Sequence, residues 1–182
     1  GFFASARVWW MLRVMGHTDI RVIDGGFAAW QAIDGEIEDL PPVSAERHFT
    51  PRVRADLVRD MGQVKAASTD GTAQILDARP AGRFDGSAPE PRADLKSGHM
   101  PGAANIQASD LLTPAGLFKS AEDLKPLLAD YLDKPVITSC GSGVSAALIN
   151  LALARLGHWD AALYDGSWTE WASHDGNPIE TA

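Results

Sequence analysis

Short apolar runs alternate with stretches of helical periodicity along most of the chain. Apolar runs rich in β-branched residues predict buried strands, and the spacing of apolar residues elsewhere predicts helices. The predicted strands are 22–23, 74–77, 135–139 and 163–164. The predicted helices are 4–15, 54–67, 121–132 and 144–156. Strands that alternate with helices favour an α/β fold, in which a central parallel sheet has helices on both faces.

One segment of the chain occurs twice. Residues 16–30 (GHTDIRVIDGGFAAW) align without gaps to residues 157–171 (GHWDAALYDGSWTEW). The matched positions include the Gly-His pair, the Asp-Gly turn and a final tryptophan, which is Trp30 in one copy and Trp171 in the other. A predicted apolar helix precedes each copy. Duplication of a strand–turn–helix unit is therefore the best interpretation.

The repeat predicts the domain boundaries. Residues 1–36 are expected to be the C-terminal remnant of a first, truncated domain, because the position matching Cys140 would precede the chain. Residues 37–48, rich in acids and proline, are expected to be a linker, and residues 49–182 a second domain that is nearly complete. Apolar residues of the remnant would normally be buried on the missing sheet: Phe2, Phe3, Val8, Trp9, Trp10 and Leu12. The remnant is expected to be mobile, to fold back on the second domain, or to drive self-association.

Composition excludes several classes of function. The chain has 182 residues and a net charge of -8, with acids and bases intermixed, which argues against nucleic acid or an anionic membrane as a partner. No apolar run could span a bilayer and no signal-peptide layout is present, so a cytoplasmic location is expected. The histidines lack metal-ligand spacing, and a single cysteine forms no intramolecular disulfide. No cofactor or metal is expected.

That cysteine, Cys140, lies where a predicted strand meets a predicted helix. Sites in open α/β sheets form beyond the carboxyl ends of strands. Gly141 and Gly143 permit a tight turn, and backbone N–H groups at the start of a helix favour an anion. Because the thiolate is the reactive form of cysteine, this position predicts a nucleophile. A structural cysteine at the end of a buried strand is the alternative.

The run CGSGVSA at 140–146 resembles the active loop of mercaptopyruvate sulfurtransferases, which are two-domain rhodanese-type sulfurtransferases. Four other pieces agree with this family: DARPAGRF at 77–84, APEPR at 88–92, SGHMPGAANI at 97–106 and YDGSWTEW at 164–171. The resemblance covers residues 49–172, and residues 1–30 resemble the end of the family's first domain. Ser145 departs from the threonine that is common in the family, but keeps the hydroxyl.

The resemblance implies roles for the loop residues. Cys140 would take sulfur as a persulfide, release pyruvate, and pass the sulfur to a thiol or cyanide acceptor. Ser142 would hydrogen-bond near the nucleophile and help to relay a proton. The remaining residues of the active-site loop are Gly141, Gly143, Val144 and Ser145.

The resemblance also implies that Arg83 and Arg92 hold the carboxylate and keto oxygen of the substrate. A guanidinium fork matches a planar, anionic 2-oxo acid. Surface ion pairs with nearby acids are the alternative for these arginines. Those acids are Asp85, Glu90 and Asp94. Relatives that prefer thiosulfate place basic residues just after the cysteine, whereas this loop is neutral there; 3-mercaptopyruvate is therefore the expected donor, with thiosulfate second.

Other residues of these motifs are expected to be structural. His99 would brace a turn, and Asp77 and Arg79 would tie the end of a strand to neighbouring loops. Trp168 and Trp171 would pack the last helix into the core.

Three alternative functions fit the sequence to different degrees. Cysteine phosphatases and arsenate reductases use a similar loop, but they need an arginine where this chain has Ala146. A binding module on the same fold would be expected to lose Cys140. A folded but impaired fragment, or a sulfur-carrier module, stays open because the family's first domain supplies an aspartate and a histidine whose motifs are absent here. The expected partners are a sulfur donor, a thiol or cyanide acceptor, a thioredoxin-like reductant and the missing first rhodanese domain.

Overall fold

The computed structural model describes residues 2–41, 43 and 45–181. The α-helices are α1 (Phe2–Val14), α2 (Gly26–Ala32), α3 (Met61–Asp70), α4 (Ala81–Asp85), α5 (Ala121–Leu128), α6 (Ala146–Arg155) and α7 (Ser167–Ala172). The strands are β1 (Val58–Arg59), β2 (Gln74–Asp77), β3 (Ala104–Asn105), β4 (Val136–Ser139) and β5 (Ala162–Tyr164). Short 3-10 helices span Ala55–Leu57, Ala108–Leu111 and Ala129–Tyr131. None of the helices in these described ranges is long and apolar enough to cross a membrane.

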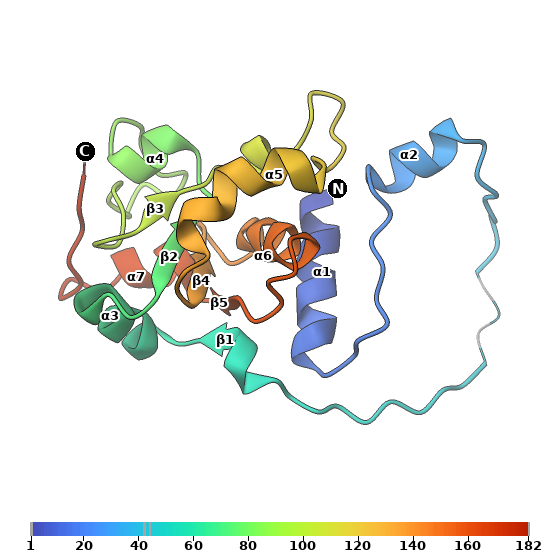
Figure 1. Cartoon of the computed structure of the whole chain (residues 1–182), viewed down its shortest axis with the longest axis horizontal. Helices are drawn as coiled ribbons and strands as arrows, with labels where there is room; N and C mark the ends of the chain where they lie inside the picture. Colours follow the sequence, from blue (N-terminus) through green and yellow to red (C-terminus); the bar gives the residue numbers. More distant parts are fainter. Residues whose placement is uncertain (1, 42, 44, 182) are drawn as a thin grey trace.

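The strands form one parallel sheet in the order β1-β5-β4-β2-β3 (Figure 1). The register pairs Asp77 of β2 with both Ser139 of β4 and Asn105 of β3, so these strands end at the same level. The loops that follow β2, β4 and β5 therefore gather at one edge of the sheet. The predicted α/β fold with a parallel sheet is confirmed.

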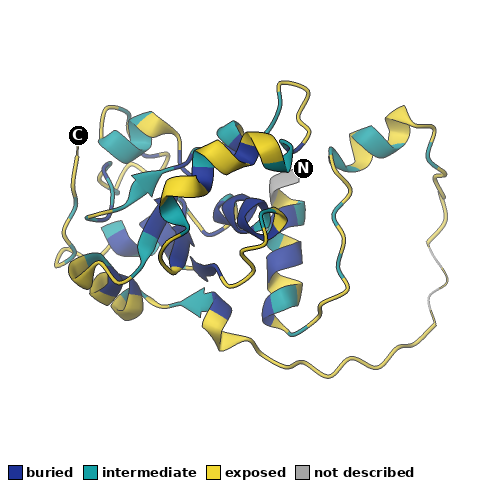
Figure 2. Ribbon diagram, in the orientation of Figure 1, coloured by how far each residue is buried: buried dark blue, intermediate teal, exposed yellow. Residues whose placement is uncertain are grey.

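Alternate residues of the strands enter two separate cores, as the period of an extended chain requires. Leu76 and Leu163 point to the core that contains α1, α5 and α6. Ile75, Ile137 and Tyr164 point to the core that contains α3 and α7. Helices thus cover both faces of the sheet, and Figure 2 shows α6 and the central strands as the most buried elements.

The predicted helix over 54–67 is wrong in its first half. A 3-10 turn and β1 occupy that stretch, because Val58 and Arg59 pair with β5. The helix begins only after Asp60, whose carboxylate accepts a hydrogen bond from the backbone of Gln63 at 2.8 Å. The side chain of Gln63 accepts in return from the backbone of Asp60. This capping box fixes the start of α3.

The predicted strand Val22–Ile23 is also wrong. The structure assigns no strand there, and no described strand lies beside it to accept its backbone hydrogen bonds. The helix predicted at 4–15 is confirmed as α1, and α2 follows the Asp-Gly turn of the first copy. In Figure 1, α1 stands next to α6, whereas α2 lies apart from the sheet.

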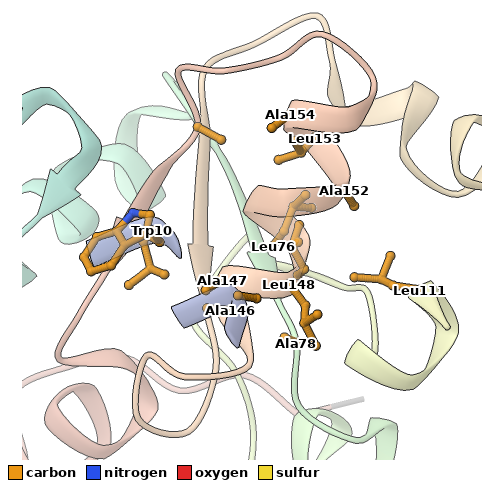
Figure 3. Packing of buried hydrophobic residues seen from close by; sticks show 14 of the residues in the cluster. Trp10, Leu76, Ala78, Leu111, Ala146, Ala147, Leu148, Ala152, Leu153 and Ala154 are labelled. Atoms are coloured by element: carbon orange, nitrogen blue, oxygen red, sulfur yellow. The ribbon is translucent and has the colours of Figure 1, made fainter. Parts of the chain in front are cut away.

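Helix α1 folds back on the second unit of the chain. Trp9 and Trp10 are each 4% exposed, and Figure 3 shows Trp10 in one apolar cluster with Ala146, Ala147 and Leu148 of α6. The outer face of α1 is open, with Val8 53% and Leu12 36% exposed. The side chains of Phe2 and Phe3 lie outside the described residues.

Candidate active site

A pocket of about 400 Å³ lies at the carboxyl edge of the sheet. Seven of the eight predicted site residues line it. They are Arg83, Arg92, Cys140, Gly141, Ser142, Val144 and Ser145. The eighth, Gly143, belongs to the same loop but is buried and does not line the pocket. The fold therefore brings together residues that lie up to 62 positions apart in the printed sequence.

Cys140 follows β4 directly and is 1% exposed, as a free thiol. Its backbone is held from the side of α7. Its N–H donates to Ser167 Oγ at 3.2 Å, and its carbonyl accepts from the N–H of Trp168 at 2.8 Å. The cysteine therefore has a fixed backbone at the floor of the pocket.

The active-site loop presents unused hydrogen-bond donors. The backbone N–H groups of residues 141–145 donate to no acceptor within the described part of the chain. The carbonyls of Gly141 and Gly143 are bound outside the loop instead, by Thr169 and Arg7 respectively. Because C=O and N–H point in opposite directions across a trans peptide, these contacts turn the following N–H groups away from Thr169 and Arg7. Successive free N–H groups before a helix form a cradle for an anion.

Close neighbours crowd both loop glycines, but only Gly143 is required to be glycine. Gly143 has φ of 76°, and a Cβ there would lie 2.8 Å from Asp165 Oδ1. A Cβ at Gly141 would lie 3.1 Å from Arg83 Nη2. Any side chain at position 143 would meet both backbone strain and a clash.

Arg83 and Arg92 differ in whether their side chains are paired. Arg83 forms a fork with the buried Glu90, with Nε to Oε1 at 3.0 Å and Nη2 to Oε2 at 2.5 Å. Glu90 also accepts from Arg79 at 2.8 Å. Arg83 thus forms the ion pair with Glu90 that the sequence offered as an alternative, and it also lines the pocket. The side chain of Arg92 is exposed and makes no hydrogen bond or ion pair with any described residue, so Arg92 is the readily available cation.

Comparison with known proteins assigns this architecture. The sequence model of the rhodanese-like domain matches residues 60–174, which contain the loop and both arginines. The chain belongs to the rhodanese-like domain family. This membership was expected from the motifs of the sequence, and it is confirmed.

Several relatives of this rhodanese chain carry curated names. It is 40% identical over 98% of its length to the 3-mercaptopyruvate sulfurtransferase of Escherichia coli (strain K12), of which it covers 64%. It is 38% identical over its whole length to the mitochondrial thiosulfate/3-mercaptopyruvate sulfurtransferase 1 of Arabidopsis thaliana, of which it covers 54%. The crystal structure of SseA from Escherichia coli matches 92% of this chain and 63% of that one, with a TM-score of 0.78 at 39% identity. The chain thus spans less than two thirds of the length of each of these relatives.

The contacts of the residues expected to be structural in the rhodanese domain agree with that role, and Arg79 in addition lines the pocket. Asp77 and Arg79 form a buried pair, each 1% exposed, and Arg79 lies over the ring of Trp168 at 4.2 Å. His99 Nδ1 lies 2.9 Å from the carbonyl of Phe84, and the two rings stack. Trp168 and Trp171 are fully buried in the core.

The sequence did not predict that residues after β5 hold the active-site loop in place. Thr169 donates its backbone N–H and its Oγ1 to the carbonyl of Gly141, at 3.0 and 2.6 Å. Ser167 donates to the carbonyl of Tyr164 while accepting from Cys140. Burial raises the pKa of the Tyr164 phenol, so that group stays neutral. The segment YDGSWTEW agreed with the family in the sequence, but its hydrogen bonds to the active-site loop depend on the fold.

Proposed function

We propose that this chain carries the catalytic site of a sulfurtransferase, which takes sulfur from 3-mercaptopyruvate onto Cys140. One observation carries the proposal: the single cysteine lies under a cradle of unpaired N–H donors, in a pocket that also contains Arg83 and Arg92. The cradle favours an anionic sulfur, and the arginines suit an anionic substrate.

The proposed reaction has two half-reactions. The Cys140 thiolate attacks the sulfur of 3-mercaptopyruvate, an S–S bond forms and the C–S bond breaks. The electron pair of the C–S bond passes to carbon, and the resulting enolate takes a proton to become pyruvate. Ser142 lines the pocket and is the proposed relay for that proton. An acceptor thiol or cyanide then attacks the outer sulfur of the persulfide and returns the Cys140 thiolate.

The substrate carboxylate is assigned to Arg92, whose guanidinium is free to form a two-pronged contact. Arg83 is assigned to the keto oxygen. Two of its donors are held by Glu90, but Arg83 lines the pocket and its Nη2 lies beside Gly141 of the loop. Glu90 fixes the direction of the Arg83 fork, because it is itself held by the buried Arg79.

Thiosulfate is the second candidate donor. Relatives of this chain are named for thiosulfate alone, for 3-mercaptopyruvate alone, or for both. Gly141 and Ser142 give the loop no basic side chain to hold a sulfonate, which favours 3-mercaptopyruvate. A phosphatase is disfavoured because Ala146, at the position where that class needs arginine, is fully buried in α6.

The test compares kcat/KM for the two donors, with cyanide as the acceptor. Arg92→Gln should lower kcat/KM for 3-mercaptopyruvate about 10- to 100-fold, the loss expected for charge-assisted hydrogen bonds. Lys96→Gln is the matched control, because Lys96 is exposed on the same loop and does not line the pocket. Equal losses in the two variants would contradict the role assigned to Arg92, and better use of thiosulfate by the wild type would contradict the assigned donor.

A further inference from the structure

We propose that Arg7 of α1 is a positioning residue for the active-site loop, together with its partner Asp165. The residues sit on opposite sides of the loop in the sequence, and Arg7 lies 136 positions before the residue it holds. The consequence for turnover rests on the proposed function, whereas the consequence for the geometry of the loop does not.

One nitrogen of Arg7 joins two segments. Its Nη1 donates to the carbonyl of Gly143 at 3.1 Å and lies 2.6 Å from Asp165 Oδ1. The guanidinium carbon lies 4.5 Å from the centre of the Trp10 ring, and the Arg7 side chain is 20% exposed. Trp10 is itself buried against α6. The position of the guanidinium is therefore defined by the core on one side and by Asp165 on the other.

Residues 142–145 have no other side-chain support within the described part of the chain. Thr169 and Trp168 bind the carbonyls of Gly141 and Cys140, but they do not reach further along the chain. Among the described side chains, that of Arg7 alone hydrogen-bonds to residues 142–145. The second half of the cradle thus depends on a helix from the other end of the chain.

Gly143 makes this contact necessary. With φ of 76° and no Cβ, Gly143 can rotate its peptide more freely than any other residue type could. While Arg7 holds the carbonyl of Gly143, the N–H of Val144 points the opposite way. Without Arg7, a flip of this peptide would replace a donor of the cradle by a carbonyl oxygen. That oxygen would repel an anion.

The same helix contains a matched control, Arg13. Its Nη2 donates to the carbonyl of Trp159 at 2.8 Å, and its guanidinium carbon lies 4.8 Å from the ring centre of Trp9. Like Arg7, Arg13 joins α1 to a backbone carbonyl of the second unit and lies over a tryptophan ring, but it does so away from the loop and without an ion pair to any described residue. Arg13→Gln reports the general effect of weakening the docking of α1.

The test measures alkylation of Cys140, the single cysteine, by iodoacetate and by iodoacetamide. These reagents differ mainly in charge, so the ratio of their rates reports how well the loop receives an anion. Arg7→Gln should lower the ratio about tenfold and kcat for 3-mercaptopyruvate about 10- to 100-fold, as expected for a misplaced group near the reacting atoms. Arg7→Lys should restore part of both, and Arg13→Gln should leave both near the wild-type values.

Asp165→Asn separates geometry from charge. This variant removes a negative charge beside the loop, so a simple electrostatic effect would raise the alkylation ratio. Loss of the hold on Arg7 should lower it. Because Asp165→Asn leaves the sequence of α1 unchanged, it serves as the test if Arg7→Gln does not fold. A raised ratio, or equal effects of Arg7→Gln and Arg13→Gln, would overturn the proposal. If both variants lower the ratio but the wild type transfers no sulfur, the proposed function alone would be refuted.

Discussion

The two copies of the repeated segment share part of their turn geometry but not their surroundings. In the second copy, β5 pairs with β1 and β4, and Trp171 is fully buried. In the first copy no strand forms, α2 has no buried residue, and the indole of Trp30 donates to the nearby carbonyl of Glu36. Figure 2 shows this contrast, with α2 exposed or half-buried throughout and β5 dark blue.

The shared turns indicate what the repeat determines locally. Gly16 and Gly157 occupy matching positions and have φ of 87° and 92°. Gly26 and Ser167 also match, with φ of 64° and 51°. The matched Gly25 and Gly166 differ, however, with φ of 73° and -60°. The repeat thus reproduces part of the turn geometry, whereas a strand needs neighbours that satisfy its backbone groups.

The largest difference is expected from the matched tryptophans. Trp171→Ala should destabilise the protein by about 3–5 kcal/mol, because it empties a fully buried site. Trp30→Ala removes a partly exposed side chain and should cost less than about 1 kcal/mol. Urea unfolding followed by far-UV circular dichroism gives both values. Similar losses would show that the first copy is packed as tightly as the second.

A smaller effect is expected at the matched left-handed positions. Ser167→Ala keeps the strained conformation but removes the hydroxyl that accepts from Cys140 and donates to Tyr164, at a cost of about 1–3 kcal/mol. Gly26→Ser places a side chain in open space, so it should cost only the backbone strain of about 1 kcal/mol. Ser167→Gly, which relieves that strain, should be milder than Ser167→Ala. In urea unfolding, a milder Ser167→Ala than Ser167→Gly would mean that the left-handed backbone there is not strained, and no loss in Ser167→Ala would mean that the hydroxyl contributes nothing.

The smallest effect on stability is expected at Thr169, whose match in the first copy is Ala28. Thr169→Val removes the hydrogen bond to Gly141 and should cost about 1 kcal/mol, with a clear fall in the alkylation rate of Cys140. Thr69→Val is the control, because Thr69 donates to the carbonyl of Lys65 on the exposed α3. That control should cost a similar amount of stability and leave the alkylation rate unchanged. An equal fall in the alkylation rates of Thr169→Val and Thr69→Val would show that the hydrogen bond from Thr169 has no specific effect on Cys140.

The sequence predicted the parts of the molecule that depend on local pattern. The strand 74–77, the parallel sheet and Cys140 between a strand and a helix all follow from periodicity and glycine placement. It failed at 54–67, where pairing with a distant strand overrode helical spacing. It also gave no role to Arg7, because the contact with Gly143 exists only after α1 has docked on α6. Supports of a site that come from distant segments have no short-range signal.

The central claim is that Cys140 receives sulfur from 3-mercaptopyruvate. Its most direct test is the intact mass of the chain after treatment with that donor and removal of excess reagent. The wild type should gain the mass of one sulfur atom, lose it again on addition of cyanide, and show no gain as Cys140→Ser. An unchanged wild-type mass, or the same gain in Cys140→Ser, would contradict the account.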